Sequence, residues 1–77
     1  MASEHSYTVV LEPQVEGGYT VTVPALPEVV TESNTEMEAL AMAKEAIGLV
    51  IEYRKAQGLP IPPDAPPAVR TVKVAAA

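Results

Sequence analysis

Residues 17–24 read GGYTVTVP, and the other elements of the chain can be placed around this segment. The pair Gly17-Gly18 suits a tight turn, because glycine adopts positive φ without steric cost. Over residues 19–23, Tyr and Val alternate with Thr, which is the period-two pattern of a half-buried strand. The run 6–12 before the turn is also rich in β-branched residues. We therefore predict an antiparallel hairpin, followed by a short third strand over residues 28–31.

A single long helix is predicted over residues 35–57. Thr35 and Glu38 form a T-x-x-E capping box, in which the Thr hydroxyl accepts a hydrogen bond from a free N–H of the first turn. Gly58 suits the left-handed residue that often follows a helix, and Pro60 cannot continue one. At 1.5 Å per residue, such a helix is roughly 34 Å long.

The apolar residues of this helix fall on two faces when they are placed at 100° intervals. A first seam suits contact with the sheet and consists of Leu40, Ala43, Ile47, Val50 and Ile51. A second stripe consists of Met42, Ala46, Leu49 and Tyr53. One sheet cannot bury both faces, so something else should cover the second stripe. The Pro-rich segment 59–67 could fold over it, or another subunit or protein could cover it, and we favour the latter.

The C-terminal part of the chain differs in composition. Residues 60–67 hold five of the eight prolines; because such a segment is stiff, we predict a fixed crossover over residues 59–68. Residues 69–74 read VRTVKV and are predicted to form a final strand at a sheet edge. The predicted fold class is α+β, in the order β-β-β-α-β, with one long helix packed on an antiparallel sheet. We treat residues 1–77 as one domain with a core over about 6–58.

Charge is distributed unevenly along the chain. The net charge is −5, and residues 1–43 contain seven Glu and no Lys or Arg. Proteins that bind nucleic acid by themselves usually carry a basic patch, so we expect no direct nucleic-acid binding. An acidic surface can instead steer a basic partner towards itself.

The sequence offers no catalytic, cofactor or metal site. His5 is the only His, and Cys is absent, so neither a triad-type nucleophile nor a His or thiolate metal site is supported. A phosphate-cradling Gly-rich motif is also missing. The chain has no apolar run of the roughly 20 residues that span a membrane, and it does not begin with a signal-peptide pattern. We expect a cytoplasmic protein that is not an enzyme and needs no cofactor.

The hairpin and the helix start resemble the HicB-like antitoxin family over about residues 6–57. The motifs that carry the resemblance are GGYTVTVP at 17–24, the turn Leu26-Pro27 and the helix start Glu38-Ala39-Leu40. The resemblance implies a partial RNase H-like fold of the β-β-β-α-β type. Glu28 stands where the family usually has Gly, which adds a charge to the turn.

The resemblance also implies a partner. HicB-like proteins bind and block a HicA-type toxin, a small basic mRNA interferase. We expect the acidic hairpin and helix start to steer such a toxin, and the second stripe to dock against a partner chain. The predicted partner-binding residues are Glu12, Glu16, Glu32, Glu36, Met42, Ala46, Leu49 and Tyr53.

Self-association is a further expectation. A small domain gains stability by burying surface against a copy of itself, so we predict a homodimer or homotetramer. Many HicB-like antitoxins carry a C-terminal DNA-binding segment, for which the residues after Val74 leave no room, so operator binding is not expected. The alternative function is that of a stand-alone homo-oligomeric domain that retains the fold without a toxin partner.

Overall fold

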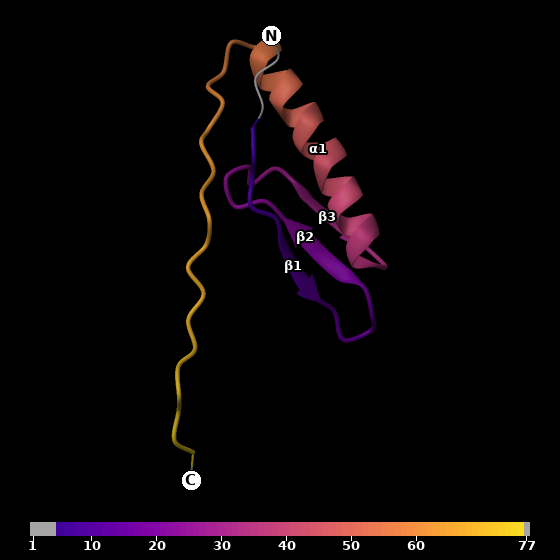
Figure 1. Cartoon of the computed structure of the whole chain (residues 1–77). Helices are drawn as coiled ribbons and strands as arrows, with labels where there is room; N and C mark the ends of the chain where they lie inside the picture. The colour runs from indigo at the N-terminus through magenta and orange to yellow at the C-terminus, as the bar shows by residue number, and fades with distance from the viewer. Residues whose placement is uncertain (1–4, 77) are drawn as a thin grey trace.

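The computed structural model describes residues 5–76, which form a three-stranded sheet covered by one helix (Figure 1). The strands are β1 (Val10–Pro13), β2 (Tyr19–Thr22) and β3 (Val30–Ser33), and the helix is α1 (Glu36–Ala56). The sheet is antiparallel in the order β1-β2-β3. This arrangement confirms the predicted α+β class; the RNase H-like comparison stays a prediction.

The β1–β2 turn is closed by two backbone hydrogen bonds. The Gly17 N–H donates to the Gln14 carbonyl and the Gln14 N–H donates to the Gly18 carbonyl, both at 3.0 Å. Gly17 and Gly18 have φ of 100° and 81°, a region that side chains with a Cβ avoid. At Gly18 the backbone also passes close to β3, because a Cβ there would lie 2.5 Å from the Ser33 carbonyl oxygen. The predicted glycine turn is therefore confirmed.

The ends of α1 follow the predicted capping pattern. The Thr35 hydroxyl accepts a hydrogen bond from the Glu38 N–H at 3.1 Å, which satisfies one of the free donors of the first turn. At the other end, Gly58 has a φ of 68°, and the Leu59 N–H donates to the Arg54 carbonyl at 2.8 Å. The helix therefore ends and the chain changes direction at Gly58, because glycine adopts a positive φ without steric cost.

The core lies between α1 and the inner face of the sheet. Val21 packs with Ala39 and Ala43 in one buried cluster. A second cluster of Val23, Leu26 and Val29 fills the space under the β2–β3 connection. α1 packs on β2 and β3, and the small side chains of Ala39 and Ala43 allow the helix to approach the sheet closely.

The burial of α1 corrects the expected division into two apolar faces. Leu40, expected to cover the sheet, is 49% exposed. Ala46, assigned to the second stripe, packs instead against the cluster under the β2–β3 connection. The reason is that α1 lies on β2 and β3 rather than over the whole sheet. The side of the helix that faces the core therefore carries Ala39, Ala43 and Ala46, and Leu40 lies outside it.

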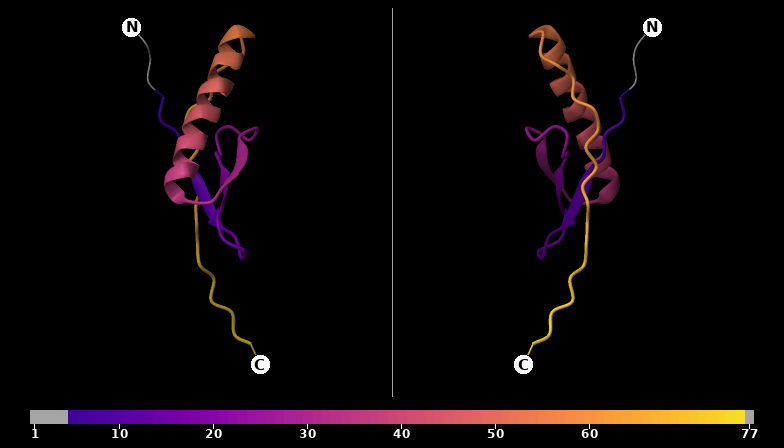
Figure 2. Two further views of the ribbon diagram at one scale, coloured as in Figure 1. Left: turned by 90° about the vertical axis from the view of Figure 1, so that its right-hand side faces the viewer. Right: turned by 90° about the vertical axis from the view of Figure 1, so that its left-hand side faces the viewer.

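The C-terminal tail also corrects an expectation. Residues 69–74, predicted to be a strand, are extended but belong to no sheet. Figure 2 shows the tail running past the hairpin and ending beyond the β1–β2 turn, and the molecule measures 58 × 25 × 20 Å. A strand requires a neighbouring strand for its backbone hydrogen bonds, and these residues have none within the described chain.

Candidate functional site

Acidic side chains gather at the hairpin end of the sheet. The pairing register aligns Glu12 of β1, Thr20 of β2 and Glu32 of β3 in one row. Since neighbouring residues in a strand alternate between faces and Val21 is buried against α1, this row lies on the face of the sheet opposite the helix. Both glutamates are exposed, and two strand spacings separate them by roughly 10 Å.

Other acidic residues extend this surface around the turn. Glu16 and Glu32 line one open hollow with Gln14, Val15 and Gly17. A neighbouring hollow brings Glu32 together with Glu38 at the start of α1. Glu36, the first residue of α1, is exposed. We call Glu12, Glu16, Glu32, Glu36 and Glu38 the acidic end; the sequence analysis treated Glu38 only as a capping residue.

The charges of the acidic end are available to a partner. The described residues contain one ion pair, which joins Glu28 and Arg54. Neither of these residues belongs to the acidic end. Within residues 5–76, no three acidic or His side chains are placed so that they could hold a metal ion. An array of exposed carboxylates without counter-charges attracts cationic surfaces over about a Debye length, roughly 10 Å at 0.1 M salt.

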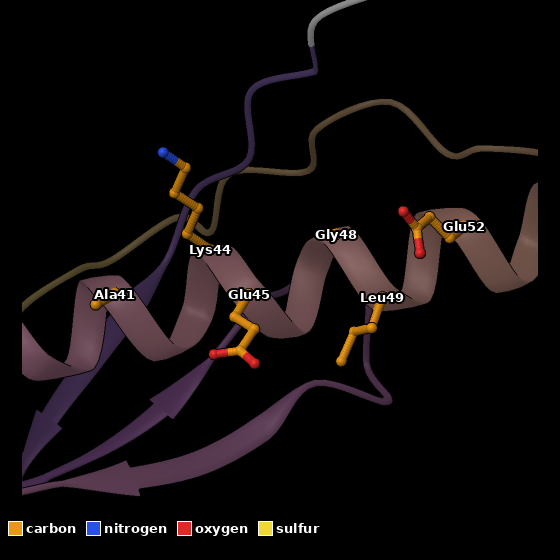
Figure 3. A pocket seen from close by; sticks show the side chains of 6 residues that line it. All are labelled: Ala41, Lys44, Glu45, Gly48, Leu49 and Glu52. Carbon is orange, nitrogen blue, oxygen red and sulfur yellow. The ribbon is translucent and has the colours of Figure 1, made fainter.

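The second stripe on α1 is divided between the core and the surface. Met42 and Ala46 are half-buried, whereas Leu49 and Tyr53 are each 61% exposed. Leu49 borders an open groove on α1 with Ala41, Lys44, Glu45, Gly48 and Glu52 (Figure 3). The stripe is therefore divided: Leu49 and Tyr53 are exposed, while Ala46 packs against the core.

The proline segment lies along the N-terminal segment and leaves Leu49 and Tyr53 uncovered. The Tyr7 hydroxyl donates to the Pro62 carbonyl at 2.6 Å. The Thr8 N–H and hydroxyl donate to the two Asp64 carboxylate oxygens at 2.8 and 2.7 Å. These hydrogen bonds from Thr8 hold the pKa of Asp64 below its ordinary value.

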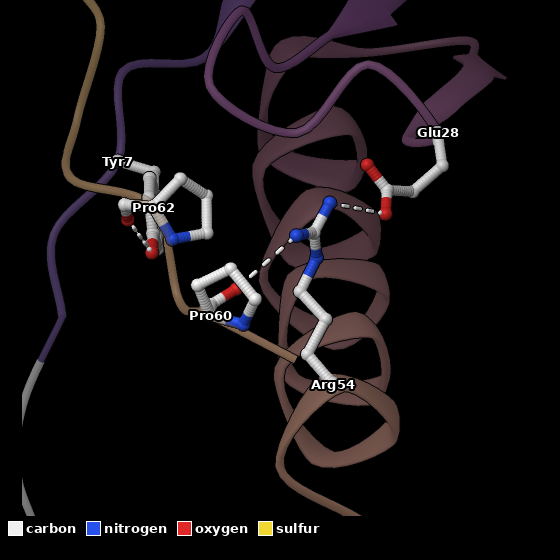
Figure 4. Close-up of polar contacts among 5 residues, drawn as sticks. All are labelled: Tyr7, Glu28, Arg54, Pro60 and Pro62. Carbon is white, nitrogen blue, oxygen red and sulfur yellow. Dashed lines mark hydrogen bonds and ion pairs between the residues drawn. The ribbon is translucent and has the colours of Figure 1, made fainter. Parts of the chain in front are cut away.

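Glu28, the departure from the family pattern, has a definite structural role. Its carboxylate pairs with Arg54 of α1 at 2.9 Å, and Arg54 also donates to the Pro60 carbonyl at 3.2 Å (Figure 4). A hydrogen bond from its own backbone N–H and the Arg54 guanidinium together hold the pKa of Glu28 below its ordinary value. Arg54 thereby connects the β2–β3 connection, the end of α1 and the tail, a link that no motif predicted.

Within residues 5–76 no helix combines the length and the apolar character that crossing a bilayer requires. The outward side of α1 carries Lys44, Glu45 and Glu52, so this side is suited to water or to a polar partner.

Known proteins are similar to this chain over part of its length. It is 45% identical over 58 residues to UPF0150 protein Ta0767 of Thermoplasma acidophilum. The matched residues make up 75% of this chain and 84% of the relative. It is 38% identical over 58 residues to UPF0150 protein ssr1765 of Synechocystis, covering 75% and 73%. It is 47% identical over 47 residues to Antitoxin HicB 1 of Photorhabdus laumondii, covering 61% of this chain and 30% of that protein's length. No protein-family model matches the chain.

Proposed function

This chain belongs to the HicB-like family, and from that premise we propose that it is an antitoxin-type module that neutralises a HicA-type toxin by binding it. The name of the Photorhabdus relative supports an antitoxin role. The resemblance of the hairpin and helix start implies the class of partner, a small basic mRNA interferase. A cytoplasmic location belongs to the same proposal, because the mRNA that such a toxin cuts is in the cytoplasm.

The acidic end is the observation on which this proposal rests. It presents exposed carboxylates that have no ion-pair partner within the described chain, which suits a basic protein surface. Complementary charge speeds the encounter and favours one orientation of the partner. The exposed side chains of Leu49 and Tyr53 would then add apolar contact area, since fully buried aromatic side chains often contribute most to an interface.

Association kinetics with a HicA-type toxin test the proposal. The variant Glu12→Lys/Glu32→Lys should associate at least tenfold more slowly than wild type at low salt, and the difference should shrink as salt is raised. The comparison variant Glu45→Lys/Glu52→Lys changes the net charge equally but beside Leu49 on α1, outside the acidic end, and should slow association less than Glu12→Lys/Glu32→Lys does. Stopped-flow fluorescence measures both rates.

Three results would refute the proposed function. The first is an absence of complex between the wild-type chain and any HicA-type toxin encoded beside it, measured by co-expression and pull-down. The second is an equal association rate for wild type and Glu12→Lys/Glu32→Lys at low salt, which would show that the acidic end is not the docking surface. A stable complex in which RNA cleavage continues would also exclude neutralisation.

A stand-alone homo-oligomeric domain is the second candidate function. The exposed Leu49 and Tyr53 and the valines of the tail, Val69, Val72 and Val74, favour it, because single domains rarely leave such side chains uncovered without a partner. Such a domain would show its final oligomeric state without a toxin, and addition of the toxin would change neither its mass nor the rate of RNA cleavage.

A further inference from the structure

A cleft lies between α1 and the N-terminal segment that leads into β1. Ile47, Gly48 and Ile51 of α1 form its floor, and Tyr7 lines it from the N-terminal segment. The cleft exists because α1 packs on β2 and β3, which leaves a gap between the helix and the chain before β1. Its volume is about 340 Å³, near the lower end of the range for small-molecule sites. A protein partner needs roughly 800 Å² on each side, so a cleft of this size suits a small molecule.

The walls of the cleft are in place before any ligand binds. Ile47 and Ile51 are half-buried, and Ile47 packs against both core clusters. The Tyr7 hydroxyl donates to the Pro62 carbonyl at 2.6 Å, and the Tyr7 ring stacks on the His5 ring at a centroid distance of 6.4 Å. A site that is already ordered loses little conformational freedom on binding, which strengthens the association.

Gly48 keeps the middle of the cleft open. Glycine inside a helix is less favourable than alanine. A Cβ at residue 48 would meet nothing within 4 Å, so no close approach of the chain to itself requires glycine there. The absent side chain leaves free space over the helix backbone, beside the side chains of Ile47 and Ile51 that line the same cleft. The fold does not need glycine at this position, whereas an open cleft does.

Cationic side chains border the apolar floor. Lys44 and Lys55 line the cleft and lie about three helical turns apart, roughly 16 Å along the axis. Figure 3 shows Lys44 and Glu45 pointing to opposite sides of α1. Among residues 5–76, no acidic side chain lines the cleft, and neither lysine forms an ion pair there. In a chain with a net charge of −5, this cleft is a place that favours an anion.

We propose that the cleft binds a small amphipathic carboxylate, a molecule with an apolar chain and one anionic head group. The apolar chain lies along Ile47, Gly48 and Ile51, and the carboxylate pairs with a lysine at the border of the floor. Burial of the chain supplies most of the affinity, and the charge-assisted hydrogen bond from the ammonium group fixes its direction. The site is separate from the acidic end, and the proposal is independent of any toxin.

An NMR titration with straight-chain carboxylates tests the proposal. Decanoate should bind the wild-type chain with a Kd of about 1 mM or tighter and should shift the backbone amide signal of Gly48 until saturation. Full burial of a methylene tightens binding about fourfold. In this open cleft we expect a gain of roughly twofold for each methylene from hexanoate to octanoate and decanoate. No saturable shift at Gly48, or equal affinities for hexanoate and decanoate, would overturn the proposal.

Charge reversal tests the role of the lysines. Lys44→Glu/Lys55→Glu should weaken decanoate binding by about tenfold or more, the effect of losing a hydrogen bond between charged groups. The matched control Arg70→Glu/Lys73→Glu makes the same change in net charge at exposed residues of the tail and should bind nearly as the wild type does. Equal losses for the two variants would show that net charge rather than the cleft governs binding, and the proposal would be wrong.

Filling the cleft tests its position without a change of charge. Leucine favours a helix more than glycine does, and a Cβ at residue 48 meets open space, so Gly48→Leu should be at least as stable as the wild type in urea. It should nevertheless bind decanoate about tenfold more weakly or worse, whereas Gly48→Ala should bind nearly as the wild type does. A Gly48→Leu variant with wild-type affinity would contradict the proposal. All these titrations use the chain without a toxin, so failure of toxin binding would leave them unaffected.

Discussion

Replacing Gly18 with alanine should destabilise the domain much more than replacing Gly17 with alanine. Both glycines have positive φ, so an alanine at either position pays the cost of a left-handed backbone, about 1–2 kcal/mol. At Gly17 the added Cβ meets nothing within 4 Å. At Gly18 it would lie 2.5 Å from the Ser33 carbonyl oxygen, so the backbone of β2 or β3 must move.

The difference between the two variants isolates this close approach. Overpacking a fixed structure costs about 1–3 kcal/mol, whereas the entropy that alanine removes from the unfolded chain is the same for both variants. The free energy of unfolding of Gly18→Ala should therefore be about 1–3 kcal/mol lower than that of Gly17→Ala. A domain of this size has a total stability of roughly 4–12 kcal/mol, so the loss is a large part of the whole.

Urea unfolding followed by circular dichroism at a fixed chain concentration measures the difference. With a urea dependence of about 1 kcal/mol per M, typical of a small domain, the midpoint of Gly18→Ala should lie roughly 1–3 M below that of Gly17→Ala. The concentration must be fixed because self-association would raise the apparent stability. Equal midpoints would refute the reasoning, since they would show that β3 yields freely to a Cβ at residue 18.

The remaining predictions concern the helix cap and the tail. Thr35→Ala should lower the free energy of unfolding by about 1 kcal/mol, because the Glu38 N–H loses its acceptor. Thr35→Ser keeps the hydroxyl and should keep the stability of the wild type. Equal losses of stability for the two variants in urea melts would contradict the role of the hydroxyl. Because Thr8 holds the pKa of Asp64 below its ordinary value of 3.8, the stabilisation from this contact should be present above pH 3.8 and be lost as the pH falls through the lowered pKa. Carboxyl NMR of Asp64 measures that pKa, and Thr8→Ala should raise it; a pKa that does not change would contradict the contact.

Local signals in the sequence were sufficient for the elements of the folded part. The glycine pair, the alternation over residues 19–23 and the capping box each act within a few residues, and the structure confirms the hairpin and the helix they predicted. The acidic residues were also recognisable, because charge is a property of composition. Their function as a binding surface stays a prediction.

Within residues 10–56, the sequence by itself determined which segments become strands and helix, because turn, cap and periodicity effects act between near neighbours. Only the tertiary structure decided which apolar side chains of α1 are covered: the way in which the helix sits on β2 and β3 packs Ala46, half-buried, against the core and leaves Leu40 exposed. It also decided that Glu28 pairs with Arg54, 26 residues away. The run 69–74 remained unpaired because a strand needs a neighbour in space, and no strand of the described chain pairs with it.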